Sequence, residues 1–236
     1  MKEVFLVLSD SKVGLLSPDE ALDGMQVPID GEGSAADVAG QIEDRLGFNF
    51  KGKKLVLAAN CKKTLIRVAD ANEFGHKRGF FKKKIADGVA WEVIKSVFPF
   101  GPSINEDTHL FDISVYSDKK FVCFGLPVDI CEKLAEIGKE LTGSLHKVSR
   151  LETIENLMFA NHCGEDKIII FPQDDGFRLL AIKDSLPENA FYISNHADRR
   201  EAELERVLVC LGEKRTVCTS SFMLPSDDLG WISKYK

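Results

Sequence analysis

The stretch DKIIIFPQDDGFRLLAIKDSLPENAFYISNHADRREAELERVLVCL, residues 166–211, decides the fold of this chain. Its first half predicts three strands, at 168–171, 177–182 and 190–193, because short apolar runs alternate with polar turns rich in Asp, Gly and Pro. Its second half predicts a helix with Asp198 as the N-cap. The apolar residues at helical spacing are Ala202, Leu204, Val207, Leu208 and Leu211. The stretch is therefore a predicted β-meander followed by an amphipathic helix.

The start of the chain predicts a similar unit. Strands are expected at 3–9, 13–16, 25–29 and 54–59, and a helix capped by Ser34 and Gly47 precedes the last of them. The middle of the chain predicts a strand at 64–69, a long helix at 74–98, strands at 110–116 and 120–126, and a helix from Pro127 to Gly143. A strand at 145–148, a helix at 151–161 and a strand at 215–219 complete the expected elements. Meanders alternating with helices in two rounds indicate an α/β fold.

The composition excludes several classes of protein. With 236 residues, 44% of them hydrophobic and 29% charged, the chain supports an ordinary packed core in one or two domains. The formal net charge of −6 argues against nucleic acid as a partner, because phosphate binding needs concentrated positive charge. No signal peptide is visible, and no apolar run approaches the ~20 residues of a membrane-spanning helix. The six cysteines contain no Cys-x-x-Cys pair, so we expect no metal site, no redox motif and a reducing cytosol.

The order of the expected elements resembles the actin-like fold, a ribonuclease H-like architecture of two lobes with an inserted β-α-β-β subdomain. More narrowly, it is similar to the PilM proteins of type IV pilus systems and to the cytoplasmic domain of GspL from type II secretion. The local matches are Trp91-Glu92, 98–102, Glu106-Asp107, 111–115, 124–127, Gly176 and 184–187. The resemblance implies a first lobe at 1–62 and 120–163, an inserted subdomain at 63–119 and a reduced second lobe at 164–236.

The loops that hold nucleotide in ATP-binding actin-like proteins are altered here. The first requires a glycine that lets backbone amides approach a phosphate, but the matching run is Ser9-Asp10-Ser11-Lys12. In the second, Asp174-Asp175-Gly176 is followed by Phe177 and Arg178, which we expect to crowd the phosphate space. The third, 211–214, keeps one glycine. We therefore interpret Asp10, Ser11, Asp174 and Gly176 as a vestigial nucleotide site, and we predict no cofactor, no metal and no enzymatic activity.

Two charged clusters are candidate partner surfaces. The first includes Lys82, Lys83 and Lys84 on the long helix, and it is either a dock for an acidic partner or anionic lipid headgroups, or a solvated helix face. The second begins with Arg199 and Arg200 on the last helix, and its Glu and Arg residues at helical spacing also suit a merely exposed face.

The resemblance implies a scaffold at the cytoplasmic face of the inner membrane, in a type II secretion or type IV pilus platform. Such a protein recruits the assembly ATPase, contacts inner-membrane platform proteins and forms a homodimer. If the natural polypeptide continues, the resemblance to GspL places a membrane helix shortly after Lys236. An actin-like ATP-binding protein or ATPase is the alternative, and a filament former related to FtsA is a third hypothesis.

Overall fold

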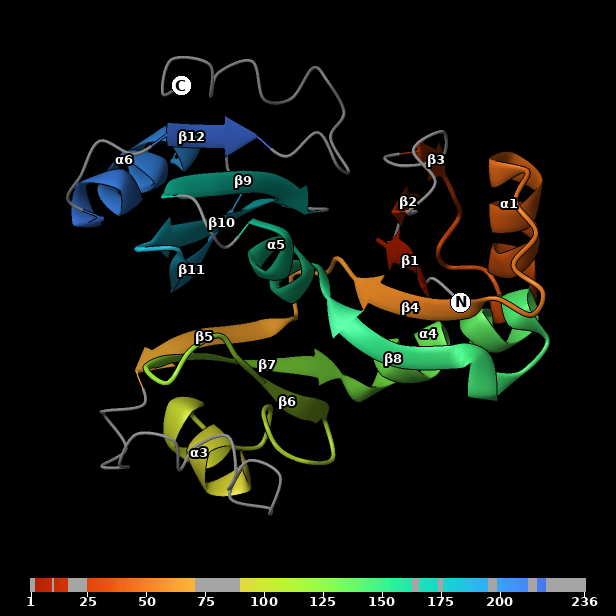
Figure 1. Ribbon diagram of the computed structural model, residues 1–236, viewed down its shortest axis with the longest axis horizontal. Helices are drawn as coiled ribbons and strands as arrows, with labels where there is room; N and C mark the ends of the chain where they lie inside the picture. Colours follow the sequence, from red (N-terminus) through yellow and green to blue (C-terminus); the bar gives the residue numbers. More distant parts are fainter. Residues whose placement is uncertain are drawn as a thin grey trace.

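The computed structural model describes residues 3–9, 11–16, 25–70, 90–162, 166–173, 176–194, 199–211 and 216–219. In this part of the chain the strands form three sheets, and Figure 1 shows them around a short central helix. Two of the sheets contain the expected meander units, and the third pairs strands of the expected insert, residues 63–119, with the strand at 120–127.

The first sheet has the order β3-β2-β1-β4-β8. Its strands are β1 (Glu3–Leu8), β2 (Lys12–Leu16), β3 (Met25–Pro28), β4 (Lys54–Ala59) and β8 (Val148–Thr153). β1 is parallel to β4 and β4 to β8, whereas β1, β2 and β3 are antiparallel. Leu6 and Leu57 belong to a core cluster that also contains side chains of α1 (Ala35–Leu46) and α4 (Val128–Thr142). Both helices therefore cover the same face of this sheet.

The ends of α1 follow the predicted capping chemistry. The Ser34 side chain accepts a hydrogen bond from the Asp37 amide, and Gly47 ends the helix with a φ of 60°. The buried residues of the helix are Val38, Ala39, Ile42 and Leu46. The predicted caps at Ser34 and Gly47 and the predicted apolar face of this helix are therefore confirmed.

The second sheet has the order β11-β10-β9-β12. Its strands are β9 (Lys167–Gln173), β10 (Gly176–Lys183), β11 (Leu186–Ser194) and β12 (Thr216–Thr219). Asp184 and Ser185 join β10 to β11 with φ values of 50° and 64°, which is the pattern of a type I′ turn. Helix α6 (Arg200–Cys210) packs on one face through Leu204. The predicted meander and helix are confirmed.

The third sheet has the order β5-β7-β6, with β5 (Leu65–Asp70), β6 (His109–Val115) and β7 (Lys120–Pro127). Helix α3 (Ala90–Val97) packs on it, and the Phe111 ring lies 5.7 Å from Trp91 and 5.2 Å from Phe100 between centroids. The expected insert boundary at 119/120 falls within this sheet, because β7 pairs with both β5 and β6. A boundary that follows the sheets lies after Pro127.

Helix α5 (Ile154–His162) lies among the three sheets. Its Phe159 is fully buried in one cluster with Val7 of β1, Val122 of β7 and Leu180 of β10. α5 therefore contributes to one core that all three sheets share, and Figure 1 shows its place among them.

The start of α5 differs from the sequence prediction. Residues 145–148 were expected as a strand and 151–161 as a helix, whereas the structure has a 3₁₀ helix at Leu145–Lys147, and β8 continues to Thr153. Parallel pairing explains the difference, because Leu57 and Ala59 of β4 align with Leu151 and Thr153. Tertiary pairing has overridden the helical spacing of the apolar residues.

Three smaller differences occur at helix ends. Asp198, the predicted N-cap of α6, lies outside the described residues; Arg199 occupies the N-cap position and its side chain makes no capping bond. Ala202 is exposed rather than buried. Of the predicted helix at 74–98, the structure describes residues from Ala90, and the helix ends at Val97.

The glycine in the middle of α1 provides a first prediction. Gly40 is exposed, and a Cβ added there meets no atom within 4 Å. Gly40→Ala is therefore expected to stabilise the protein by about 1 kcal/mol, the difference in helix propensity. Urea unfolding measures the change, with Ala36→Gly on the same helix as the inverse control. A destabilised Gly40→Ala variant would contradict the described packing of α1.

Candidate functional site

In the turn between β1 and β2, backbone amides donate hydrogen bonds to acceptors of the same turn. The Ser9 amide donates to the Lys12 carbonyl at 2.9 Å, and the Lys12 amide donates to the Ser9 hydroxyl at 3.1 Å. Ser11 is exposed, and its carbonyl accepts the Ile29 amide at 2.9 Å. Asp10 lies outside the described residues. A phosphate site needs backbone N–H groups that point at the ligand. The Ser9 and Lys12 amides are not available for this, because they already donate hydrogen bonds within the turn.

The matching position in the second sheet is Gly176, the first residue of β10. A Cβ added to Gly176 would lie 2.3 Å from the Ile193 carbonyl oxygen and 2.6 Å from the Tyr192 hydroxyl oxygen. Tyr192 of β11 therefore packs directly against this glycine. Asp174 lies outside the described residues. Gly176 is needed here for close packing of β11, which gives the glycine a purely structural reason to be present.

Phe177 and Arg178 point to opposite faces of the second sheet. Phe177 is buried with Ile170 and Leu204 beneath α6, so the prediction that it crowds a phosphate is wrong. Arg178 lies on the α5 face, with its guanidinium carbon 5.3 Å from the centre of the Tyr192 ring. The alternation of side chains along a strand explains the separation.

Arg178 forms a buried ion pair with Glu155 at the start of α5. Its Nε lies 3.1 Å from Glu155 Oε1, and the two side chains are 7% and 0% exposed. The Nε–H is poorly aligned for a hydrogen bond with this oxygen, so the contact is primarily electrostatic. Arg178 Nη2 also donates to the Thr64 carbonyl at 3.3 Å, just before β5.

Gln173, at the end of β9, completes this group. Its Nε2 donates to Glu155 Oε1 at 3.3 Å and to the Cys61 carbonyl at 3.3 Å. We call Glu155, Gln173 and Arg178, with the carbonyls of Cys61 and Thr64, the junction cluster. It joins α5, the second sheet and the segment between β4 and β5.

Burial sets the electrostatics around the start of α5. It raises the pKa of Glu155, and the positive charge of Arg178 acts in the opposite direction. It also raises the pKa of Glu152. The Thr153 amide at 3.0 Å, the Asn156 side chain and the Arg150 guanidinium, whose Nε lies 3.9 Å from Glu152 Oε2, only partly oppose this rise. Glu152 therefore resists ionisation in the folded state.

The raised pKa of Glu152 predicts a pH dependence of stability. The folded protein binds this proton more tightly than the unfolded chain, so the contribution is present below the ordinary value of 4.5 and is lost as pH rises through the raised pKa. Glu152→Gln removes the dependence. Urea unfolding should show the variant gaining stability relative to the parent protein between pH 4.5 and neutrality. A difference that stays constant over this range would contradict the prediction.

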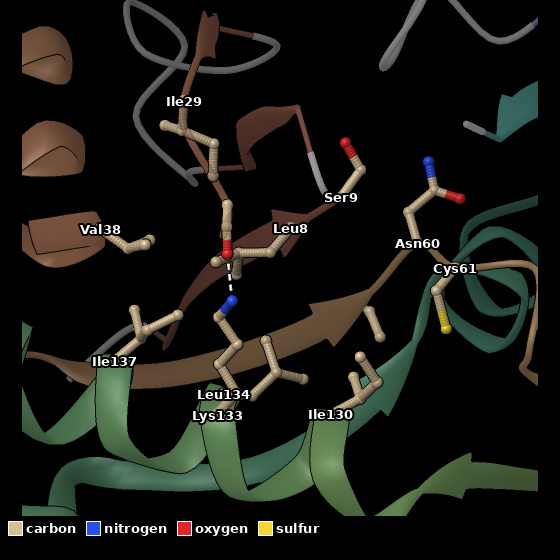
Figure 2. A pocket seen from close by; sticks show the side chains of 12 residues that line it. Leu8, Ser9, Ile29, Val38, Asn60, Cys61, Ile130, Lys133, Leu134 and Ile137 are labelled. Atoms are coloured by element: carbon tan, nitrogen blue, oxygen red, sulfur yellow. Dashed lines mark hydrogen bonds between the residues drawn. The ribbon is translucent and has the colours of Figure 1, made fainter. Parts of the chain in front are cut away.

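A pocket lies at the carboxyl ends of β1 and β4, beside α4. Figure 2 shows Ser9, Asn60 and Cys61 near its rim and apolar side chains from α4 and α1 along its wall. The Lys133 ammonium donates to the Gly31 carbonyl across it. The cavity measures about 60 Å³, well below the roughly 300–1,000 Å³ of pockets for drug-sized ligands. It is too small for a nucleotide.

Burial disfavours the thiolate form of Cys61, Cys123 and Cys131. Cys61, Cys123, Cys131 and Cys210 are free, and burial raises the pKa of Cys61 and brings that of Cys123 to about 12. A buried thiol in this environment is a poor nucleophile. Within the described ranges, no three His, Cys, Asp or Glu side chains are arranged to hold a metal ion.

The predicted partner residues are only partly described. Arg199 is exposed and Arg200 half-buried at the start of α6, on the face of the second sheet opposite the junction cluster. Lys82, Lys83 and Lys84 lie outside the described residues. No helix among the described residues has the length and apolar character needed to cross a bilayer.

Sequence reasoning missed Glu155, Gln173 and Tyr192 as parts of the site. A signal for the ion pair was present, because Glu155 interrupts the apolar helix I-E-N-L-M-F and Arg178 interrupts the apolar strand F-R-L-L-A-I. Opposite charges within two apolar segments are expected to pair when the segments are buried. Which segments meet depends on the tertiary fold.

Comparison with solved structures confirms the predicted fold class: the protein has an actin-like fold. It is similar to a Bacteroides thetaiotaomicron protein described as having an actin-like ATPase fold and unknown function. The TM-score is 0.55 at 10% identity, over 98% of this chain and 86% of the other.

The fold is also that of a type II secretion component. The cytoplasmic domain of EpsL, an inner membrane component of the Vibrio cholerae type II secretion system, matches with a TM-score of 0.59 at 10% identity, over 95% of this chain and 83% of the other. The PilM–PilN type IV pilus biogenesis complex matches with a TM-score of 0.49 at 13% identity, over 89% of this chain and 74% of the other. No protein-family model and no curated protein matches the sequence. The structural resemblance is therefore one of fold.

Proposed function

We propose that this protein is an actin-like scaffold of a type II secretion or type IV pilus platform at the cytoplasmic face of the inner membrane. The observation that carries the proposal is the likeness to the EpsL cytoplasmic domain over nearly the whole chain. In this function the protein recruits the assembly ATPase, contacts inner-membrane platform proteins and forms a homodimer. It needs neither nucleotide nor another cofactor.

The described residues beside the two turns that match phosphate-binding loops favour a scaffold over an enzyme. The Lys12 amide is bonded to Ser9, and the space beside Gly176 is filled by Tyr192. An ATPase of this fold relies on backbone amides and dipoles directed at the phosphates. An ATP-binding protein, the alternative function, would have to rearrange both turns on binding.

The exposed start of α6 is the proposed contact for the ATPase. Arg199 is exposed and Arg200 half-buried at the start of α6, and Val209, which is 78% exposed, lies near the other end of the helix. An acidic surface would complement the two arginines at the start of the helix. We propose the basic residues at 82–84 as a second contact for the ATPase.

Binding to the amino-terminal domain of the cognate assembly ATPase tests this function. We expect a complex with a Kd on the order of 10 µM, about −7 kcal/mol, and the same affinity with and without Mg-ATP. Arg199→Ala combined with Arg200→Ala should weaken the affinity about tenfold, because each substitution removes one positive charge from the proposed interface.

Lys53→Ala combined with Lys54→Ala is the matched control. Both lysines are exposed at the start of β4, on the first sheet. Their removal changes the net charge equally and should leave the affinity unchanged. No complex at roughly 100 µM, or an equal loss in both double variants, would contradict the proposed contact.

A further inference from the structure

The junction cluster connects parts of the chain that no single sheet joins. Arg178 belongs to β10 of the second sheet, and Glu155 belongs to α5, which directly follows β8 of the first sheet. Thr64, whose carbonyl accepts from Arg178, precedes β5 of the third sheet. The guanidinium of Arg178 therefore links the second sheet both to α5, through Glu155, and to the segment before β5, through the Thr64 carbonyl.

The cost of burying these charges indicates a role in geometry rather than in net stability. A buried ion pair loses its hydration, so similarly sized apolar residues in its place are often equally stable or more so. Apolar residues would not reproduce the directed bonds to the Thr64 and Cys61 carbonyls, which Arg178 and Gln173 reach from the second sheet. Glu155 Oε2, Gln173 Oε1 and Arg178 Nε make no hydrogen bond within the described part of the chain, so the directional links of the cluster are the bonds to the two carbonyls and the bond from Gln173 to Glu155.

We propose that the Glu155–Arg178 pair is a permanent internal clamp, which holds the second sheet against α5 and the β4–β5 segment without any ligand. In this device the guanidinium supplies the link between the lobes. The proposal stands independently of the proposed function, because it concerns the isolated chain with neither nucleotide nor partner.

Hydrogen exchange in a double variant separates clamping from stability. Glu155→Leu with Arg178→Met removes both charges, so global stability should stay near that of the parent protein. We expect exchange to accelerate on the order of a hundredfold in the segment from Asn60 to Thr64 and at the start of β10, through local opening. The centres of β1 and β9 should change by no more than a few-fold. Arg67→Met, an exposed arginine on β5, is the matched control and should change neither region.

Arg178→Lys is a milder variant that keeps the charge. Its ammonium lacks the planar fork that serves Glu155 and Thr64 together. Exchange should therefore accelerate in the segment from Asn60 to Thr64, with the first sheet unaffected. The clamp is refuted if these segments exchange at the parental rate in the double variant and in Arg178→Lys, or if all three sheets accelerate equally.

Discussion

The fold depends on the burial of α5 among the three sheets, where every residue from Ile154 to Phe159 is buried. Ile154 and Phe159 are fully buried, and the same cluster takes in Val7, Val122 and Leu180 from three different sheets. Removing a fully buried phenylalanine costs about 3–5 kcal/mol in typical cores, so this one helix accounts for much of the cohesion between the sheets. The outer faces have separate clusters under α1 and α4, under α6 and under α3. Between the sheets, Ile66 and Val68 of β5 and Ala190 of β11 pack against the same cluster as α5.

That arrangement explains why the polar residues of the junction are buried. The start of α5 brings Glu155 against the inner face of β10, and Arg178 is the residue of that strand which meets it. Tyr192 from the neighbouring strand packs on the guanidinium and against Gly176. Tyr192 therefore fills the space beside Gly176, one of the positions that the resemblance to actin-like proteins led us to examine for phosphate binding. This packing supports the proposed scaffold function.

The sequence predicted the elements better than it predicted their contacts. Ser34, Gly47 and Gly143 marked helix ends correctly, because capping is local chemistry. The order of the elements along the chain followed from the same patterns, and its resemblance to actin-like proteins gave the fold class. The boundary of β8 was missed because its pairing with β4 is non-local. Phe177 was assigned to the wrong face because its orientation depends on the pairing register of β10, whereas the partners of Arg178 come from segments 23 and 114 residues away by number.

Isothermal titration calorimetry with Mg-ATP tests most directly whether the chain itself fills its nucleotide region. We expect no binding heat up to roughly millimolar nucleotide, equivalent to an affinity weaker than about −4 kcal/mol. Binding at micromolar concentration that disappears in Asp10→Ala would contradict it, and would restore the actin-like ATP-binding protein as the better description.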